Sequence, residues 1–395
     1  MLSTRLSASL FTAALVSVSC TSATVEDSAI STTPPSTVQD PVAETNEGVQ
    51  SIAVGIVLNT ANTGSASADR DEDFAAVAET TATSLNASSD IELRLEIATI
   101  DGVSGVASAI DDLTSRGITA LVTSCDDSTL PAVVDTAIEQ ELLVVTGCVA
   151  IPQPELSTDS LLIDLADLSD SANRIVDWLV DGDLGQIATV TSTLIPDVAQ
   201  TCVDLESETE ERITGNVVAA VEFVELVDPV ENIALELAPQ QDMIEAIAIC
   251  ALPPAIGDVT SALRSAGFDQ PVIVPWYGDP QEWAASVDDV FVFAPASRFG
   301  DDPASDVVEL FAEIDDPEPA DVVVADSLSA LVQAVEIADS AASRRVAAAL
   351  RDGDFDGTSG TLSVDTSRPS PVYRSYRVLE VINGEPQFSE LIGPS

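Results

Sequence analysis

Short apolar runs alternate with stretches of helical periodicity along most of the chain after residue 50. Ser51–Leu58 (SIAVGIVL) is an uninterrupted apolar run, which is typical of a strand buried on both faces of a parallel sheet. Phe74, Val77 and Leu85 then recur at helical spacing behind an acidic first turn. Further strands are predicted at Ile91–Ile100, Ile118–Thr123 and Leu142–Thr146, and further helices at Val106–Leu113 and Leu130–Ile138. This β-α-β-α-β-α-β order predicts a doubly wound parallel sheet.

The pattern restarts near residues 165–170 and predicts a second lobe of the same kind. Its helices are expected at Ala172–Leu179, Asp197–Arg212 and Ala255–Ala266, and its strands at Gln186–Thr191, Val217–Val224, Met243–Cys250, Pro271–Pro275 and Val290–Ala294. Two helices follow at Ala325–Ala338 and Ser343–Leu350, then a strand at Gly360–Val364 and a hairpin-like stretch at Val372–Val381. The dipeptide Asn383-Gly384 closes that hairpin, since both residues favour a tight turn.

The N-terminal segment predicts export. Residues 1–19 contain Arg5 and an apolar stretch, Leu10–Val18, which is the pattern of a signal peptide. Cys20 follows small residues and resembles the acylation site of a bacterial lipoprotein, although Ser17 stands where such signals usually carry Leu, Val or Ile. An ordinary signal peptide is the alternative. Residues 20–50 are rich in Ser, Thr, Pro and acids and are expected to form a disordered, lipid-anchored tether.

The charge of the chain excludes several classes of function. Acidic residues number 67 against 14 basic ones, all arginine, giving a formal net charge of −53. Such a charge repels phosphate backbones and anionic membrane surfaces, so nucleic acid is not expected as a partner and the membrane only through the lipid. Adaptation to salty surroundings and a lineage bias in composition both explain this acidity. The chain has no histidine or lysine, so His-based triads, His-ligated metals and lysine Schiff bases are excluded, and no cofactor or metal is predicted.

Several local motifs resemble those of one known family. The strongest stand near the C-terminal end: Ala325–Leu328 (ADSL), Val346–Leu350 (VAAAL) and Phe355–Asp365 (FDGTSGTLSVD). Cys125–Thr129 (CDDST) and Leu263–Gly267 (LRSAG) add weaker matches. Together with the order of the lobes, they resemble the type 1 periplasmic binding proteins, in particular the substrate-binding lipoproteins of branched-chain amino-acid ABC importers, over about residues 51–385.

The resemblance implies a fold, a division of the chain and a partner. The fold would be α/β, with two doubly wound parallel-sheet lobes joined by a three-segment hinge. Lobe 1 would comprise residues 51–165 plus 297–350, and lobe 2 residues 166–296 plus 355–395. A small polar solute, amino-acid-like or related, would lie between the lobes at the carboxyl ends of the strands, where open α/β sheets bind ligands. A monomer of this kind closes about its hinge and delivers the solute to an ABC permease in the membrane.

The expected ligand-binding residues depart from the family pattern. Relatives hold the carboxylate of the ligand with hydroxyl groups, at the positions where this chain has Asp126 and Ala150. At two further positions where the family pattern leads us to expect tyrosine, this chain has Pro196 and Leu252. Asp126 would repel a carboxylate and would instead hold a cationic group or cap a helix. The candidates are Arg70, Asp126, Asp127, Ser128, Val149, Ala150, Leu252, Trp276 and Tyr277. Arg70 would pair with a ligand anion or with a surface acid, while Trp276 and Tyr277 would form a ligand wall or pack under the hinge.

Four cysteines remain after Cys20, in a compartment that permits disulfides. Cys125 and Cys148 follow two strands of the first lobe, while Cys202 opens a helix and Cys250 ends a strand of the second. In a doubly wound sheet each pair falls on neighbouring elements at the same edge. We therefore expect disulfides Cys125–Cys148 and Cys202–Cys250, with free buried thiols as the alternative.

Three functions are consistent with these observations. The leading hypothesis is an extracytoplasmic solute-binding lipoprotein of an ABC importer, without catalytic activity. The second is a ligand-sensing receptor module of the same fold without a transporter. The third is an extracellular enzyme that uses Asp126 and Asp127, which is disfavoured because adjacent residues rarely converge on one substrate atom.

Overall fold

The computed structural model describes residues 51–60, 66–124, 128–148, 160–166, 170–194, 196–212, 216–275, 280–281, 283–365 and 372–393. The expected signal peptide and tether, including Cys20, lie outside the described residues. Within the described part of the chain, no helix is both long enough and apolar enough to cross a membrane.

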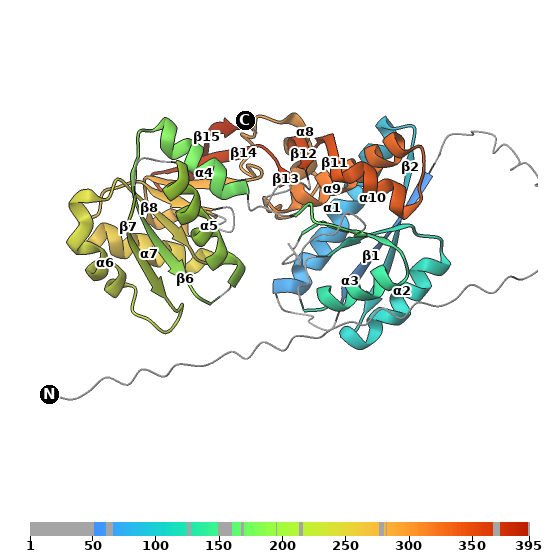
Figure 1. Cartoon of the computed structure of the whole chain (residues 1–395), viewed down its shortest axis with the longest axis horizontal. Coiled ribbons are helices and arrows are strands. Elements are labelled where there is room, and N and C mark those ends of the chain that lie inside the picture. Colours follow the sequence, from blue (N-terminus) through green and yellow to red (C-terminus); the bar gives the residue numbers. More distant parts are fainter. Residues whose placement is uncertain are drawn as a thin grey trace, which may run out of the picture. The chain divides into compact units, whose positions relative to one another are not determined.

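The first sheet has five parallel strands in the order β2-β1-β3-β4-β5. Figure 1 labels two of them, β1 and β2. Its strands are β1 (Ser51–Asn59), β2 (Glu92–Ile100), β3 (Ala120–Thr123), β4 (Leu143–Thr146) and β5 (Leu162–Ile163). The helices between them are α1 (Ala66–Ser88), α2 (Val106–Ser115) and α3 (Leu130–Glu139), with a 3₁₀ turn η1 (Val103–Gly105) before α2. The order of strands confirms the doubly wound α/β prediction for this half of the chain.

Alternate residues of β1 pack into two separate hydrophobic cores. Ile52, Val54 and Ile56 pack in a cluster that includes residues of α1. Ala53 and Val57, on the opposite face, pack in a cluster with residues of α2 and α3. Since successive side chains of a strand point to opposite faces, a strand with helices on both faces must be apolar throughout. This is why SIAVGIVL has no polar interruption.

The second sheet has seven strands in the order β15-β14-β10-β9-β8-β6-β7. The five from β10 to β7 are parallel, whereas β14 and β15 add an antiparallel hairpin. The strands are β6 (Gln186–Ser192), β7 (Asn216–Phe223), β8 (Ala246–Cys250), β9 (Val272–Val274), β10 (Val290–Ala294), β14 (Tyr376–Ile382) and β15 (Glu385–Ile392). Asn383 and Gly384 both have positive φ, 52° and 78°, so the predicted turn between β14 and β15 is present.

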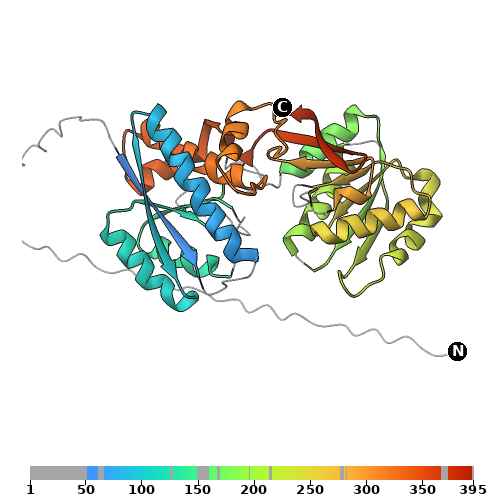
Figure 2. The same ribbon diagram turned by 180° about the vertical axis from the view of Figure 1, so that it is seen from behind.

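Helices cover both faces of the second sheet as well. They are α4 (Asp170–Asp181), α5 (Pro196–Arg212), α6 (Glu231–Leu237) and α7 (Pro253–Ser265), with 3₁₀ turns η2 (Ala238–Met243) and η3 (Ala284–Ser286). Residues of α4 and α5 share one core cluster, and residues of α6 and α7 share another. Figure 1 shows α4 and α5 in front of this sheet, and Figure 2, from behind, shows the yellow helix α7 in front.

A buried ion pair anchors α4. Arg174 Nε lies 2.8 Å from Asp170 Oδ2, and Arg174 Nη1 lies 3.0 Å from Asp177 Oδ2. The same guanidinium donates to the carbonyl of Gly393 at 3.4 Å, so α4 is joined to the end of the described chain. Burial alone would lower the pKa of Arg174, but the hydrogen bond and charge of Asp170 and the charge of Asp177 outweigh it and raise the pKa.

A small third sheet, in the order β11-β12-β13, packs with the first sheet. Its strands are β11 (Asp352–Gly357), β12 (Gly360–Asp365) and β13 (Val372–Tyr373), and the helices before it are α8 (Ser305–Ala312), α9 (Asp321–Ala338) and α10 (Ser343–Arg351). Phe355, Leu362 and Val372 belong to the cluster that contains α1 and α9. The sequence prediction placed residues from 355 onward in lobe 2. This part of the prediction differs from the observed packing, in which residues as far as Val372 share the core of the first sheet.

The chain passes between the cores of the two large sheets within a few residues. Ala294 packs with the second sheet, whereas Ala296 packs with the first. Val372 packs with the first sheet and Val378 with the second. Leu165 and Ala166 likewise pack with the first sheet, and Ala172 with the second. Within the residues that the structure describes, the chain therefore crosses between the two cores at three places.

A buried arginine ties two of these crossings together. Arg377, in β14, makes a two-point contact with Asp302, with Nε and Nη2 at 2.9 and 3.0 Å from the carboxylate oxygens. Its Nη1 donates to the carbonyl of Pro295 at 3.0 Å. Asp302 in turn accepts the backbone N–H groups of Ser297 and Ala304. All polar atoms of this buried ion pair thus have partners, which buried charges require.

Candidate functional site

Polar side chains gather at the carboxyl ends of the strands of the first sheet. Asn59 ends β1, and its Oδ1 accepts the N–H of Gly102 at 3.0 Å. Thr146 ends β4, and its hydroxyl donates to Asp164 and accepts the N–H of Ala166. These three polar side chains are buried. They hold the backbone at Gly102, which follows β2, and at Ala166, which follows β5.

Gly147 follows β4 at this edge and must be a glycine. A Cβ atom there would lie 2.6 Å from Cγ1 of Val122 and 3.1 Å from the carbonyl oxygen of Thr123. Its N–H also donates to Thr123 Oγ1 at 3.3 Å. The chain leaving β4 therefore runs directly against the end of β3.

The structure describes few of the ligand residues that the sequence predicts for the first lobe. Ser128 is exposed immediately before α3. Arg70 lies within α1 rather than in the loop before it. The other predicted residues of this lobe, Asp126, Asp127, Val149 and Ala150, lie outside the described residues. Their role in ligand binding therefore stays a prediction.

A disulfide lies at the carboxyl end of β8 in the second sheet. Cys250, the last residue of β8, is bonded to Cys202 of α5, with their Cα atoms 5.9 Å apart. Both residues are buried, and Leu252 packs against them together with Val198. The predicted Cys202–Cys250 disulfide is thus present, and it joins α5 to the strand end where Leu252 lies.

Cys148 is also disulfide-bonded. Its partner lies outside the described residues, which leaves Cys20 and Cys125 as the remaining cysteines of the chain. The pairing Cys125–Cys148 stays a prediction. Trp276 and Tyr277, expected as a ligand wall, also lie outside the described residues.

Glu225 is a carboxylate at this edge that the sequence prediction did not include. It follows β7, has only 8% of its surface exposed, and accepts the N–H of Leu252 at 3.1 Å through Oε1. An acidic residue directly after an apolar strand was the available signal. The sequence prediction places no ligand residue after the strand Val217–Val224.

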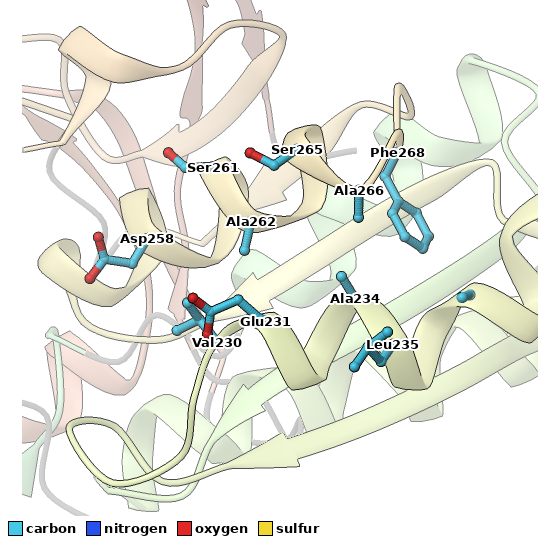
Figure 3. A pocket seen from close by; sticks show the side chains of 11 residues that line it. Val230, Glu231, Ala234, Leu235, Asp258, Ser261, Ala262, Ser265, Ala266 and Phe268 are labelled. Atoms are coloured by element: carbon cyan, nitrogen blue, oxygen red, sulfur yellow. The ribbon is translucent and has the colours of Figure 1, made fainter.

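A groove of about 840 Å³ lies between α6 and α7 (Figure 3). Ala234 and Leu235 of α6 and Ala262, Ala266 and Phe268 from α7 and its end form apolar walls. Glu231, Asp258, Ser261 and Ser265 add polar atoms. None of the residues predicted to bind ligand lines this groove. Nothing at the groove indicates what would fill it.

The described residues contain no group of three or more His, Cys, Asp or Glu side chains placed to hold a metal ion. The polar side chains described above at the strand ends carry hydroxyl, amide and carboxylate oxygens. Such groups can donate to, or accept from, a small polar solute.

Comparisons with solved structures identify the class to which the fold belongs. The branched-chain amino acid transporter substrate binding protein LivJ from Streptococcus pneumoniae, in complex with isoleucine, is 17% identical, with a TM-score of 0.63 over 87% of this chain and 100% of that one. A putative branched-chain amino acid ABC transporter protein from Rhodospirillum rubrum is 15% identical, with a TM-score of 0.70 over 86% and 100%. A solute binding protein from R. palustris in complex with benzoate is 13% identical, with a TM-score of 0.59 over 88% and 97%.

The chain therefore has the fold of the type 1 periplasmic binding proteins. Among its structural neighbours are substrate-binding proteins of branched-chain amino acid ABC transporters. At these low identities the likeness shows a shared fold. Scans against protein-family models and against curated protein sequences gave no significant match.

Proposed function

We propose that this protein is an extracytoplasmic solute-binding protein that captures a small polar solute and delivers it to an ABC importer, without catalysing a reaction. One observation carries the proposal. Within the described residues the chain crosses three times between the cores of two mainly parallel sheets, and the fold matches that of neighbours in complex with isoleucine or benzoate over nearly their whole length. A chain that crosses repeatedly between two lobes is suited to hinge closure around a ligand.

The lobes of the proposal follow the observed cores. Lobe 1 comprises residues 51–166 and 296–373, and lobe 2 residues 170–294 and 376–393. The solute binds at the carboxyl ends of the parallel strands, which is where open α/β sheets bind ligands. Leu252 lies just after β8 and Ser128 lies between β3 and α3, while Arg70, Asp126, Asp127, Val149, Ala150, Trp276 and Tyr277 are proposed as further ligand residues.

The proposed location follows from the N-terminal segment. Residues 1–19 act as a signal peptide, Cys20 carries the lipid, and residues 20–50 link the anchor to the folded part. A single lipid anchor of this kind would keep the binding protein close to its permease. Mass spectrometry of the N-terminal peptide tests this directly: a diacylated Cys20 is expected, and an unmodified peptide beginning elsewhere would contradict the anchor.

A thermal-shift screen tests the function. The full-length protein would be heated with proteinogenic amino acids, aliphatic amines, sugars, nucleosides and aromatic carboxylates such as benzoate. A ligand that binds only the folded state raises Tm by mass action, so at least one class should give a concentration-dependent rise. The absence of any rise across all classes would contradict solute binding.

A further inference from the structure

Two arginines join the three crossings between the cores to one another. Arg374 and Arg377 lie in the third crossing, and the side chains of both are almost fully buried. Arg374 Nη2 donates to the carbonyl of Leu165, near the point at which the first crossing leaves the first core. Arg377 Nη1 donates to the carbonyl of Pro295, which lies within the second crossing. Each of the other two crossings is therefore bonded to the third.

Arg374 is fixed to the first lobe. Its guanidinium pairs with Asp326 of α9 at 3.1 Å, and neither side chain is exposed. Asp326 also accepts the N–H and the hydroxyl of Ser359. Val372, two residues before Arg374, packs in the core of the first sheet. Up to Arg374, the third crossing is therefore held by the first lobe.

Arg377 is fixed to the second lobe. It pairs with Ala294 of β10 in the antiparallel ladder between β14 and β10. Its partner Asp302 lies in a loop that contacts both cores, because Phe299 packs against the second core and Ala304 against the first. The Arg377–Asp302 pair therefore lies where the second and the third crossing both pass from one lobe to the other.

The Arg377–Asp302 pair is expected to persist when the lobes move. Nε and Nη2 of Arg377 contact the two carboxylate oxygens of Asp302 at 2.9 and 3.0 Å, and the two side chains are 1% and 0% exposed. Opening a buried pair of this kind leaves charges without compensation, which is strongly destabilising. A contact that persists while two lobes rotate lies on or near the axis of rotation. The pair is thus placed to act as a pivot.

Ser375 is the least constrained residue between the two arginines. It is half-buried and belongs to no strand. The next residue, Tyr376, is fully buried and pairs with Ile392 in the ladder between β14 and β15. The carbonyl of Ser375 accepts only a long hydrogen bond, of 3.5 Å, from Arg377 Nη1. Loop residues at the end of an element are the positions that absorb backbone rotation in hinged proteins.

We propose that the Arg377–Asp302 pair is the pivot about which the two lobes close on a solute, and that the backbone of Ser375 takes up the rotation. This rests on the proposed solute-binding function and adds how closure is controlled. None of these residues is among the predicted ligand residues. They are positioning residues: they set the fraction of molecules that can close, and the apparent affinity depends on that fraction.

The first part of the test compares two arginines that bind aspartate in the same way. Arg377→Lys keeps the positive charge but loses the two-point contact with Asp302. Arg174→Lys is the matched control, because Arg174 contacts Asp170 through Nε and Nη2, at 2.8 and 3.3 Å, and that pair lies within α4 of the second lobe. Both variants should lose stability, which urea denaturation measures. Only the first alters the proposed pivot.

The second part of the test varies the backbone freedom of Ser375. Ser375→Gly adds open conformations that closure must remove, whereas Ser375→Ala removes the same hydroxyl without adding this freedom. Every full-length variant is titrated by calorimetry with the proteinogenic amino acids and with benzoate. Small-angle X-ray scattering then gives the radius of gyration with and without each compound that binds.

We expect the radius of gyration of the wild type to fall when a bound compound saturates it. Arg377→Lys should weaken Kd for that compound roughly three- to tenfold, because fewer molecules are able to close, while Arg174→Lys should change Kd by less than about twofold. Ser375→Gly should weaken Kd about two- to fivefold, which corresponds to the backbone entropy of one glycine. Ser375→Ala should change Kd by less than about twofold.

Three results would overturn the proposal and leave solute binding intact. Equal changes of Kd in Arg377→Lys and Arg174→Lys would show that the pair acts only through stability. Equal Kd values for Ser375→Gly and Ser375→Ala would exclude rotation at Ser375. Binding without a fall in the radius of gyration would exclude closure about this pivot. Failure of the wild type to bind any of the compounds contradicts solute binding and the pivot together.

Discussion

Asp326 of α9 and Arg374, which lies between β13 and β14, form an ion pair of 3.1 Å in which neither side chain is exposed to solvent. The carboxylate of Asp326 also accepts the N–H and hydroxyl of Ser359, at 3.0 and 2.6 Å. Arg374 Nη2 donates to the carbonyl of Leu165 at 2.6 Å. One arginine thus joins α9, the turn between β11 and β12, and the segment that leaves the first sheet after β5.

Removal of Asp326 alone should strongly destabilise the protein. Asp326→Ala leaves the Arg374 guanidinium buried without a counter-charge, which costs about 3–5 kcal/mol in the free energy of unfolding. Urea denaturation followed by circular dichroism measures it. Glu141→Ala provides the control, because its pair with Arg344 is exposed on both sides and should cost less than about 1 kcal/mol. Equal losses in the two variants would show that burial of the Asp326–Arg374 pair has no special effect.

The second buried pair, Arg377–Asp302, should couple strongly in a double-mutant cycle. Arg377→Met and Asp302→Leu each leave one buried charge without its counter-charge, whereas the double variant removes both charges. We expect the double variant to lose about 2–3 kcal/mol less free energy of unfolding than the sum of the losses in the two single variants. Simple additivity of the two losses would contradict the direct pairing of these side chains.

Loss of the Cys202–Cys250 disulfide should destabilise the folded state. The bond closes a sequence separation of 48 residues. On the chain-entropy model, opening a loop of that size costs about 4 kcal/mol. The measurement is the free energy of unfolding of a Cys202→Ala/Cys250→Ala variant without reductant, compared with wild type. A difference below about 1 kcal/mol would exclude this contribution.

The second disulfide can be assigned by peptide mapping. Since Cys148 is disulfide-bonded and Cys202 pairs with Cys250, we expect Cys148 to pair with Cys125 and Cys20 to be free for acylation. Proteolysis without reduction, followed by mass spectrometry, identifies the linked peptides. A Cys20–Cys148 peptide would contradict both this pairing and the lipid anchor.

Salt should stabilise the protein. With a formal net charge of −53, repulsion among carboxylates opposes the compact state. Raising the ionic strength from about 0.1 M to about 1 M shortens the Debye length from about 10 Å to about 3 Å and screens that repulsion. Tm should therefore rise between these two potassium chloride concentrations. A flat or falling Tm would show that self-repulsion does not limit stability.

The sequence predicts the parallel strands well, because burial on both faces leaves a clear apolar signal. Ser51–Leu58, Gln186–Thr191 and Val290–Ala294 lie within β1, β6 and β10 or coincide with them. It does not predict β11, whose sequence DGDFDG buries only Phe355 and has a low intrinsic preference for strand. Pairing with β12 forms this strand, and such tertiary pairing cannot be read from local periodicity.

The strand-end site was only partly predictable. Leu252 and the disulfide Cys202–Cys250 followed from their positions after predicted strands. Glu225 was missed because its burial depends on a turn with a positive φ at Leu226, which the sequence does not indicate for a leucine. The division between the two lobes near residue 355 depends on which hydrophobic core contains Phe355. The sequence alone does not distinguish the two cores for an aromatic residue, and in the structure Phe355 lies in the core of the first sheet.

The most direct test of the central claim is equilibrium titration of the full-length protein with the solutes that raise its Tm. We predict saturable binding of one solute per chain with a Kd in the micromolar range or tighter, equivalent to about −8 kcal/mol or more. The absence of saturable binding for every compound, in a protein whose unfolding remains cooperative, would contradict a solute-binding function.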